Sequence, residues 1–106
     1  FWIIMAYTPY HNILGSNGVV QVLVEKAEGP KGLKNITLTN IHNSADATID
    51  LSIRNLTSGA ETYHFVKSLV IPSDATYILD IPTFNNKTYS LVITVGSSDT
   101  VDVILS

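Results

Sequence analysis

The sequence predicts an all-β fold, an antiparallel β-sandwich of about eight strands with jelly-roll or Ig-like topology. The main observation is the alternation in residues 33–54, where Ile36 and Leu38 share a face. After a polar turn the alternation resumes, because apolar Ala47, Ile49, Leu51 and Ile53 alternate with polar Thr48, Asp50, Ser52 and Arg54. This period of two is that of a pleated strand, and no segment shows helical periodicity. We interpret residues 33–54 as a hairpin with one buried face and one wet face.

Candidate strands in the first half of the chain are residues 2–8, 19–26, 33–40 and 47–55. The first is an apolar run that ends at Thr8-Pro9. Residues 11–18 are predicted as a loop with a tight turn, since they contain Gly15-Ser16-Asn17-Gly18. In residues 19–26 the valines recur at every second position, and Gly29-Pro30 then turns the chain into the alternating pair.

Candidate strands in the second half are residues 61–71, 76–81, 89–95 and 101–105. The first of these is expected to bend or bulge, because Phe65-Val66 and residues 69–71 break the alternation. Pro82 ends the next strand, since proline has no N–H for a β ladder. Residues 96–99 are predicted to close a hairpin between the last two strands, and residues 101–105 alternate apolar side chains with Asp102 and Ile104.

Composition limits both the organisation and the function of the chain. Its 106 residues predict one β-sandwich domain, 1–106, in which residues 1–10 could form an N-terminal interaction arm. The net charge of −3 and the single arginine, Arg54, argue against nucleic-acid binding. The chain has no cysteine, and charged residues make up 14%, against about 25% in ordinary soluble domains. Thr, Ser and Asn replace them, and together with a mean hydropathy of +0.25 this composition favours a homo-oligomer.

The chain is not expected to act in a membrane. Its longest apolar run, residues 1–6, is far shorter than the roughly 20 residues that a membrane helix requires. The sequence leaves open whether Phe1 is the native N-terminus, as after a processing site, or whether Met5 is the natural start.

No pattern of catalytic or metal-binding residues is present in the sequence. His11, His42 and His64 are too far apart for a local zinc site, and no calcium loop, nucleophile elbow or phosphate-binding loop occurs. We therefore expect no enzymatic activity, no catalytic residues, no metal and no cofactor.

The N-terminal segment FWIIMAYTPY is the sharpest candidate for a functional surface, because it contains the only tryptophan and two tyrosines. One interpretation is an ordinary first strand with Trp2 in the core. The other is an arm that adds to a neighbouring subunit by strand augmentation and an aromatic anchor. The interface residues that the second interpretation predicts are Trp2, Ile3, Ile4, Tyr7 and Tyr10.

Three stretches, LKNITLTN…ADATIDLSIRN, YHFVKSLVIPSDATYILD and TYSLVITVGSSDTVDVILS, resemble small β-sandwich virion proteins of tailed bacteriophages, including many from cyanophages. The likeness covers residues 33–106. It implies a structural role on the virion, at the capsid surface as a decoration or cement protein that contacts the major capsid protein. It also allows a neck, tail or fibre component, and it carries no catalytic or cofactor residues.

A carbohydrate-binding module is a less favoured alternative. It would use Tyr63, Tyr77 or Tyr89 as a stacking platform, but these tyrosines alternate with apolar residues at inward positions. Core packing therefore explains them better.

Overall fold

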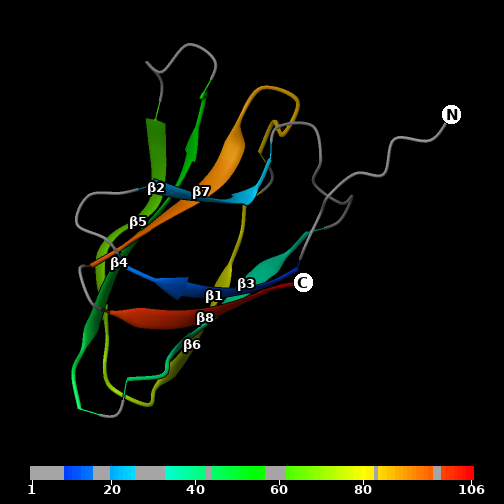
Figure 1. Cartoon of the computed structure of the whole chain (residues 1–106). Coiled ribbons are helices and arrows are strands. Elements are labelled where there is room, and N and C mark those ends of the chain that lie inside the picture. Colours follow the sequence, from blue (N-terminus) through cyan, green and yellow to red (C-terminus); the bar gives the residue numbers. More distant parts are fainter. Residues whose placement is uncertain are drawn as a thin grey trace, which may run out of the picture.

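The computed structural model describes residues 9–15, 20–25, 33–42, 44–56, 62–82, 84–96 and 99–106. These residues form eight strands and two antiparallel sheets of four, which confirms the predicted all-β sandwich (Figure 1). The strands are β1 (Tyr10–Leu14), β2 (Val20–Val24), β3 (Asn35–Asn40), β4 (Ala47–Arg54), β5 (Thr62–Ile71), β6 (Thr76–Asp80), β7 (Ser90–Val95) and β8 (Thr100–Leu105).

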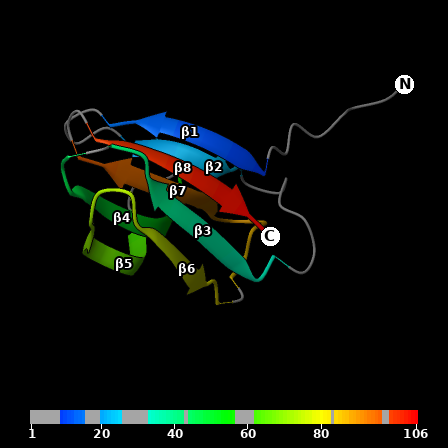
Figure 2. The same ribbon diagram turned by 90° about the horizontal axis from the view of Figure 1, so that it is seen from below.

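Strand order identifies the sandwich as a jelly roll. One sheet has the order β1-β8-β3-β6 and the other β2-β7-β4-β5, and the two layers are seen in Figure 2. The pairs β1–β8, β2–β7, β3–β6 and β4–β5 are nested, as if one long hairpin were rolled up so that alternate pairs enter alternate sheets. The topology therefore favours the jelly roll over the Ig-like alternative.

Two predicted hairpins are wrong. Strands β3 and β4 lie in different sheets, and so do β7 and β8. Residues 33–54 therefore form an arch across the sandwich, and the apolar faces of its two strands meet in the core. Of the described strands that follow each other directly in the chain, only β4 and β5 pair with one another.

The first described strand was not predicted, because residues 11–18 were expected to be a loop. Tyr10–Leu14 pairs with β8 along its full length. Only Ile13 in this strand is a buried apolar residue, and polar His11 and Asn12 precede it, so the alternation is weak. The strand predicted at residues 2–8 lies outside the described residues.

The core lies between the two sheets and is built by the predicted alternation. Ile36 and Leu38 are fully buried, and Val101, Val103 and Leu105 lie on the same inward face of the adjacent strand β8. The opposite sheet contributes Ile49, Leu51, Leu91, Ile93 and Val95.

One residue of the expected wet face is buried. Ser52 is 5% exposed, and its neighbour across the ladder, Val92, is 1% exposed. Both lie on central strands of their sheet. Thr48 is exposed as predicted, while Asp50 and Arg54 are half-buried.

The bend predicted in residues 61–71 is confirmed. Along β4 the partner of Ile49 is Leu69 and the partner of Leu51 is Val66, so β5 contains extra residues at this point. Ser68, one of these residues, has a φ of 55°, in the left-handed region.

The described residues contain no helix that could span a membrane.

Candidate functional site: the outward face of the β1-β8-β3-β6 sheet

The outward face of the β1-β8-β3-β6 sheet carries three exposed apolar side chains in one row, with half-buried Thr37 between two of them. The ladder places Tyr10 opposite Ile104, Ile104 opposite Thr37, and Thr37 opposite Ile78. Tyr10 and Ile78 are both 68% exposed, and Ile104 is 43% exposed. We call Tyr10, Ile104, Thr37 and Ile78 the apolar row, and it crosses all four strands.

Polar side chains lie on both sides of the apolar row. On one side, Nδ2 of Asn12 donates a hydrogen bond of 2.6 Å to Oδ1 of Asp102. Farther along the same line the hydroxyls of Thr39 and Thr76 are 2.9 Å apart and share a hydrogen bond.

On the other side of the row, Oγ of Ser106 donates to Oδ1 of Asn35 at 2.5 Å, and Asn35 is paired with exposed Asp80. An apolar strip with a polar margin is the usual composition of a contact surface between proteins.

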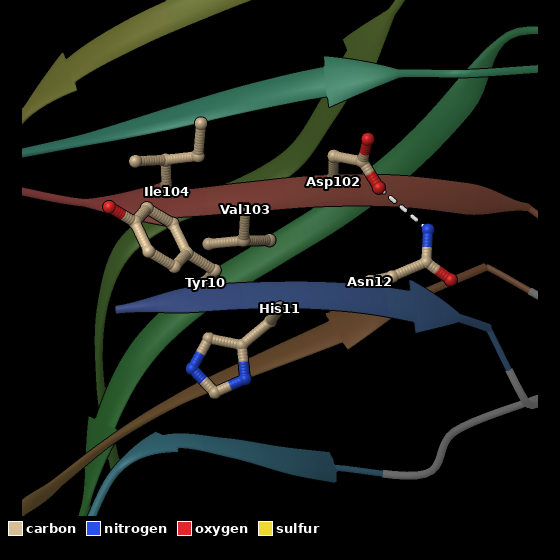
Figure 3. Close-up of a pocket in the computed structure, with 6 residues that line it drawn as sticks. All are labelled: Tyr10, His11, Asn12, Asp102, Val103 and Ile104. Atoms are coloured by element: carbon tan, nitrogen blue, oxygen red, sulfur yellow. Dashed lines mark hydrogen bonds between the residues drawn. The ribbon is translucent and has the colours of Figure 1, made fainter. Parts of the chain in front are cut away.

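A shallow hollow of about 310 Å³ lies beside Tyr10. Its lining residues come from β1 and β8 and are Tyr10, His11, Asn12, Asp102, Val103 and Ile104. Figure 3 shows the Tyr10 ring next to Ile104, while Asn12 and Asp102 are joined farther along the two strands. The His11 ring lies on the opposite side of β1 from these groups.

Of the five interface residues predicted from the sequence, only Tyr10 lies in a described part of the chain. It is the first residue of β1 and belongs to the apolar row. Trp2, Ile3, Ile4 and Tyr7 lie outside the described residues.

Sequence reasoning missed Ile78 and Ile104 as site residues. The sequence contained a signal for Ile104, because Ile104 lies two residues after Asp102 in the same strand and therefore points to the same outward face. Leu14 and Ile41, on either side of Thr100 at the end of the sheet, are also exposed.

The three tyrosines that were expected to point inward differ in their environment. Tyr77 and Tyr89 pack against the core, but Tyr63 is 54% exposed, so its expected inward position is wrong. The rings of Tyr63 and Tyr89 make an edge-to-face contact with centroids 5.8 Å apart. Neither ring lies on the sheet that carries the apolar row.

The histidines of the described residues do not form a metal site with acidic side chains. Among the described residues no three His, Cys, Asp or Glu side chains are grouped as a metal site would require. His64 is exposed, whereas His42 is half-buried and its Nδ1 accepts a hydrogen bond of 3.1 Å from the Ser44 backbone N–H. No protein-family model, curated protein or solved structure matches this chain.

Proposed function

We propose that this chain is a structural protein of a bacteriophage virion, a decoration or cement protein that stabilises the capsid by contacts with the major capsid protein and with its own copies. The observation that carries the proposal is the apolar row, which exposes Tyr10, Ile104 and Ile78 on one sheet face. Tyr10 and Ile104 are direct neighbours and Ile78 lies one strand farther, across Thr37. Exposed apolar side chains gathered on one face indicate an interaction surface. The virion as the place of action is supported by the resemblance of residues 33–106 to phage structural proteins.

The jelly-roll topology adds support of a weaker kind. This architecture is frequent in viral capsid proteins and also in lectins. A fold by itself does not determine a function, so the argument depends on the exposed face.

The energy available from the apolar row suits a protein that acts in many copies. Burying an exposed Ile or Tyr side chain contributes on the order of 1–2 kcal/mol, so the row provides a few kcal/mol per copy before the cost of association. A contact of this strength is weak when it acts alone. Repeated over a symmetric shell, linked copies can bind far more tightly than one copy does.

The test uses the virion that carries this chain. Ile104→Thr removes apolar surface from the centre of the row but keeps a residue suited to a strand, and Val70→Thr is the matched control on the other sheet, where Val70 is 48% exposed. We expect Ile104→Thr to lower occupancy on capsids about tenfold and to lower their resistance to heat, while Val70→Thr leaves both unchanged. Full occupancy by the Ile104→Thr variant would contradict the proposal.

A neck, tail or fibre position is the alternative location for the same contact function. Copy number separates the two, since a capsid surface holds hundreds of copies and a tail holds far fewer. Quantitative mass spectrometry of purified virions measures this number directly.

Carbohydrate binding is the second candidate function, and the hollow beside Tyr10 favours it. The exposed Tyr10 ring offers a stacking surface next to the amide of Asn12 and the carboxylate of Asp102. A glycan array tests it, with Tyr10→Ala as the variant and Tyr63→Ala as the control for a tyrosine exposed elsewhere. If no glycan binds the wild type, or if Tyr10→Ala binds the same glycans as the wild type, this function is excluded.

A further inference from the structure

The edges of the two sheets differ in regularity. In the β2-β7-β4-β5 sheet both edge strands are irregular, since β2 shifts register between Val22 and Val24 and β5 bulges around Ser68. Bulges of this kind protect an edge against pairing with another strand. In the other sheet both edge strands are regular, since β1 and β6 pair without a register shift and contain no proline and no lysine. Among the described residues, β6 therefore has no bulge, proline or lysine that would hinder pairing with another strand.

The hydrogen bonds of β6 show which backbone groups face its open side. Ile81 N donates to Lys34 O at 2.7 Å, and Asn40 N donates to Ala75 O at 3.0 Å. Because the direction alternates along an antiparallel strand, Tyr77 and Leu79 also face β3. The N–H and C=O groups of Thr76, Ile78 and Asp80 therefore point away from the sheet.

We propose that β6 pairs with β6 of a second copy of this chain, antiparallel and about a two-fold axis at Ile78. In this register Ile78 lies opposite Ile78 of the second copy, and Thr76 lies opposite Asp80. On the inner side of the sheet Tyr77 lies opposite Leu79 of the second copy. The inference names the partner and the strand of the contact function proposed above, and it rests on that function.

The chemistry of β6 fits its own inverted copy. Each Asp80 carboxylate meets a Thr76 hydroxyl that can donate to it, and the two carboxylates lie at opposite ends of the paired strands. The exposed Ile78 side chains meet at the centre, where each covers apolar surface of the other. A strand with a different charge pattern would not provide this match at both ends.

Pairing of this kind also joins the two apolar rows. The sheet becomes eight-stranded, and the row runs from Tyr10 through Ile104 and Ile78 into the same residues of the second copy. Three hydrogen-bonded residue pairs supply about six backbone hydrogen bonds. The area is small compared with a stable dimer, which buries at least about 1,200 Å². The dimer is therefore expected to be weak in dilute solution and to form at high concentration or on a crowded surface.

Disulfide trapping tests the register. The chain contains no cysteine, so Ile78→Cys introduces a single thiol. The Cα atoms of a hydrogen-bonded antiparallel pair are about 5.5 Å apart, a distance that a disulfide spans. We expect Ile78→Cys to form a covalent dimer at least about tenfold faster than Ile104→Cys, whose thiol lies on the same face but on β8, away from the edge. Equal rates would overturn the proposal.

Proline substitution tests the backbone pairing without a new covalent bond. The N–H of Ile78 faces the open edge, so Ile78→Pro keeps the ladder to β3 but blocks the second copy. Leu14→Pro is the matched control, because Leu14 is exposed on β1 and its N–H faces the opposite open edge. Sedimentation at up to about 1 mM should show association for the wild type and Leu14→Pro, weakened at least about tenfold in Ile78→Pro. A wild type that stays monomeric at this concentration refutes the dimer.

A charge pair at Thr76 gives a test that does not depend on the proline variant. Both Thr76→Lys and Thr76→Asp remove the hydroxyl that is bonded to the Thr39 hydroxyl, so they share that effect. Facing Asp80 of the second copy, the lysine should strengthen the dimer several-fold and the aspartate should weaken it, with both effects reduced by salt. Equal association of the two variants would count against this register.

The two proposals fail separately. Ile104→Thr should reduce capsid binding and leave the dimer intact, since Ile104 is two strands from the edge. If the wild type is monomeric but Ile104→Thr still loses capsid binding, the dimer is wrong and the proposed contact function stands. If Ile78→Cys dimerises while Ile104→Thr binds capsids normally, the dimer stands and the proposed contact function is wrong.

Discussion

The backbone N–H of Ser68 donates a hydrogen bond of 2.6 Å to Oδ1 of Asp50 on the adjacent strand. Ser68 lies in the bulge of β5 and has a φ of 55°, so the carboxylate holds the chain where it leaves the regular ladder. Asp50 therefore helps to keep one sheet edge irregular. The same molecule leaves the edge formed by β6 regular.

Replacing Ser68 by glycine should stabilise the fold. A side chain in the left-handed region costs about 1–2 kcal/mol, and glycine avoids this cost but loses more backbone entropy on folding. We expect Ser68→Gly to raise the free energy of unfolding by about 0.5–1 kcal/mol, measured by urea denaturation. Ser73→Gly is the control, because Ser73 does not have a positive φ. We expect Ser73→Gly to lower the free energy of unfolding. If Ser68→Gly lowers it by as much, the bulge relaxes in solution and position 68 is not strained.

The two glycines at one end of the sandwich should tolerate alanine unequally. A Cβ at Gly15 would collide with the backbone oxygen of Gly96, whereas a Cβ at Gly96 would first meet the side-chain Oδ2 of Asp99. A backbone atom cannot move aside as a side chain can, so we expect Gly15→Ala to cost about 3 kcal/mol and Gly96→Ala about 1 kcal/mol. Thermal unfolding of both variants checks the order. Equal losses would mean that the two loops separate easily.

Asn40 should be the polar residue whose loss is most damaging among those described here. Its side chain is fully buried, and its Nδ2 donates to the backbone oxygens of Ala45 at 2.8 Å and Ile71 at 2.9 Å. Its Oδ1 accepts from His42 N at 3.0 Å, so the residue joins the β3–β4 arch to the end of β5.

Alanine at position 40 leaves these buried groups without partners, and we expect a loss of about 2–4 kcal/mol in the free energy of unfolding. Asn12→Ala, which removes an exposed hydrogen bond to Asp102, serves as the control and should cost less than about 1 kcal/mol. Chemical denaturation compares the two. Similar small losses would show that water replaces the amide of Asn40.

The alternation of side chains predicted most strands but could not predict how they pair. It placed a strand at residues 47–55, close to the observed Ala47–Arg54. Alternation shows which side chains share a face of a strand. It does not show whether the next strand pairs with that strand in the same sheet or packs against it from the opposite sheet. The segment between β3 and β4 is long enough to cross the roughly 10 Å between packed sheets. The arch and the hairpin therefore look alike in sequence.

The candidate site was predictable only in part, for a related reason. Tyr10 was expected in an interface because it belongs to an aromatic segment, but Ile78 and Ile104 look like ordinary strand residues. Their alignment with Tyr10 depends on the order β1-β8-β3-β6, which brings residues from both ends of the chain together. Tyr63 shows the same limit, since its exposure depends on its place on edge strand β5.

His11 should be replaceable by leucine with a gain in stability. It lies on the inward side of β1 opposite Val103, and within the described residues its buried Nε2 has no hydrogen-bond partner. An unpaired buried polar atom costs about 1–3 kcal/mol, and leucine removes it and adds apolar contact with the core. We expect His11→Leu to raise the free energy of unfolding by about 1 kcal/mol. His64→Leu is the control, because His64 is exposed and should change stability by less than about 0.5 kcal/mol. Urea denaturation of the two variants measures these changes. A loss of stability in His11→Leu would show that the ring nitrogen has a hydrogen-bond partner in solution.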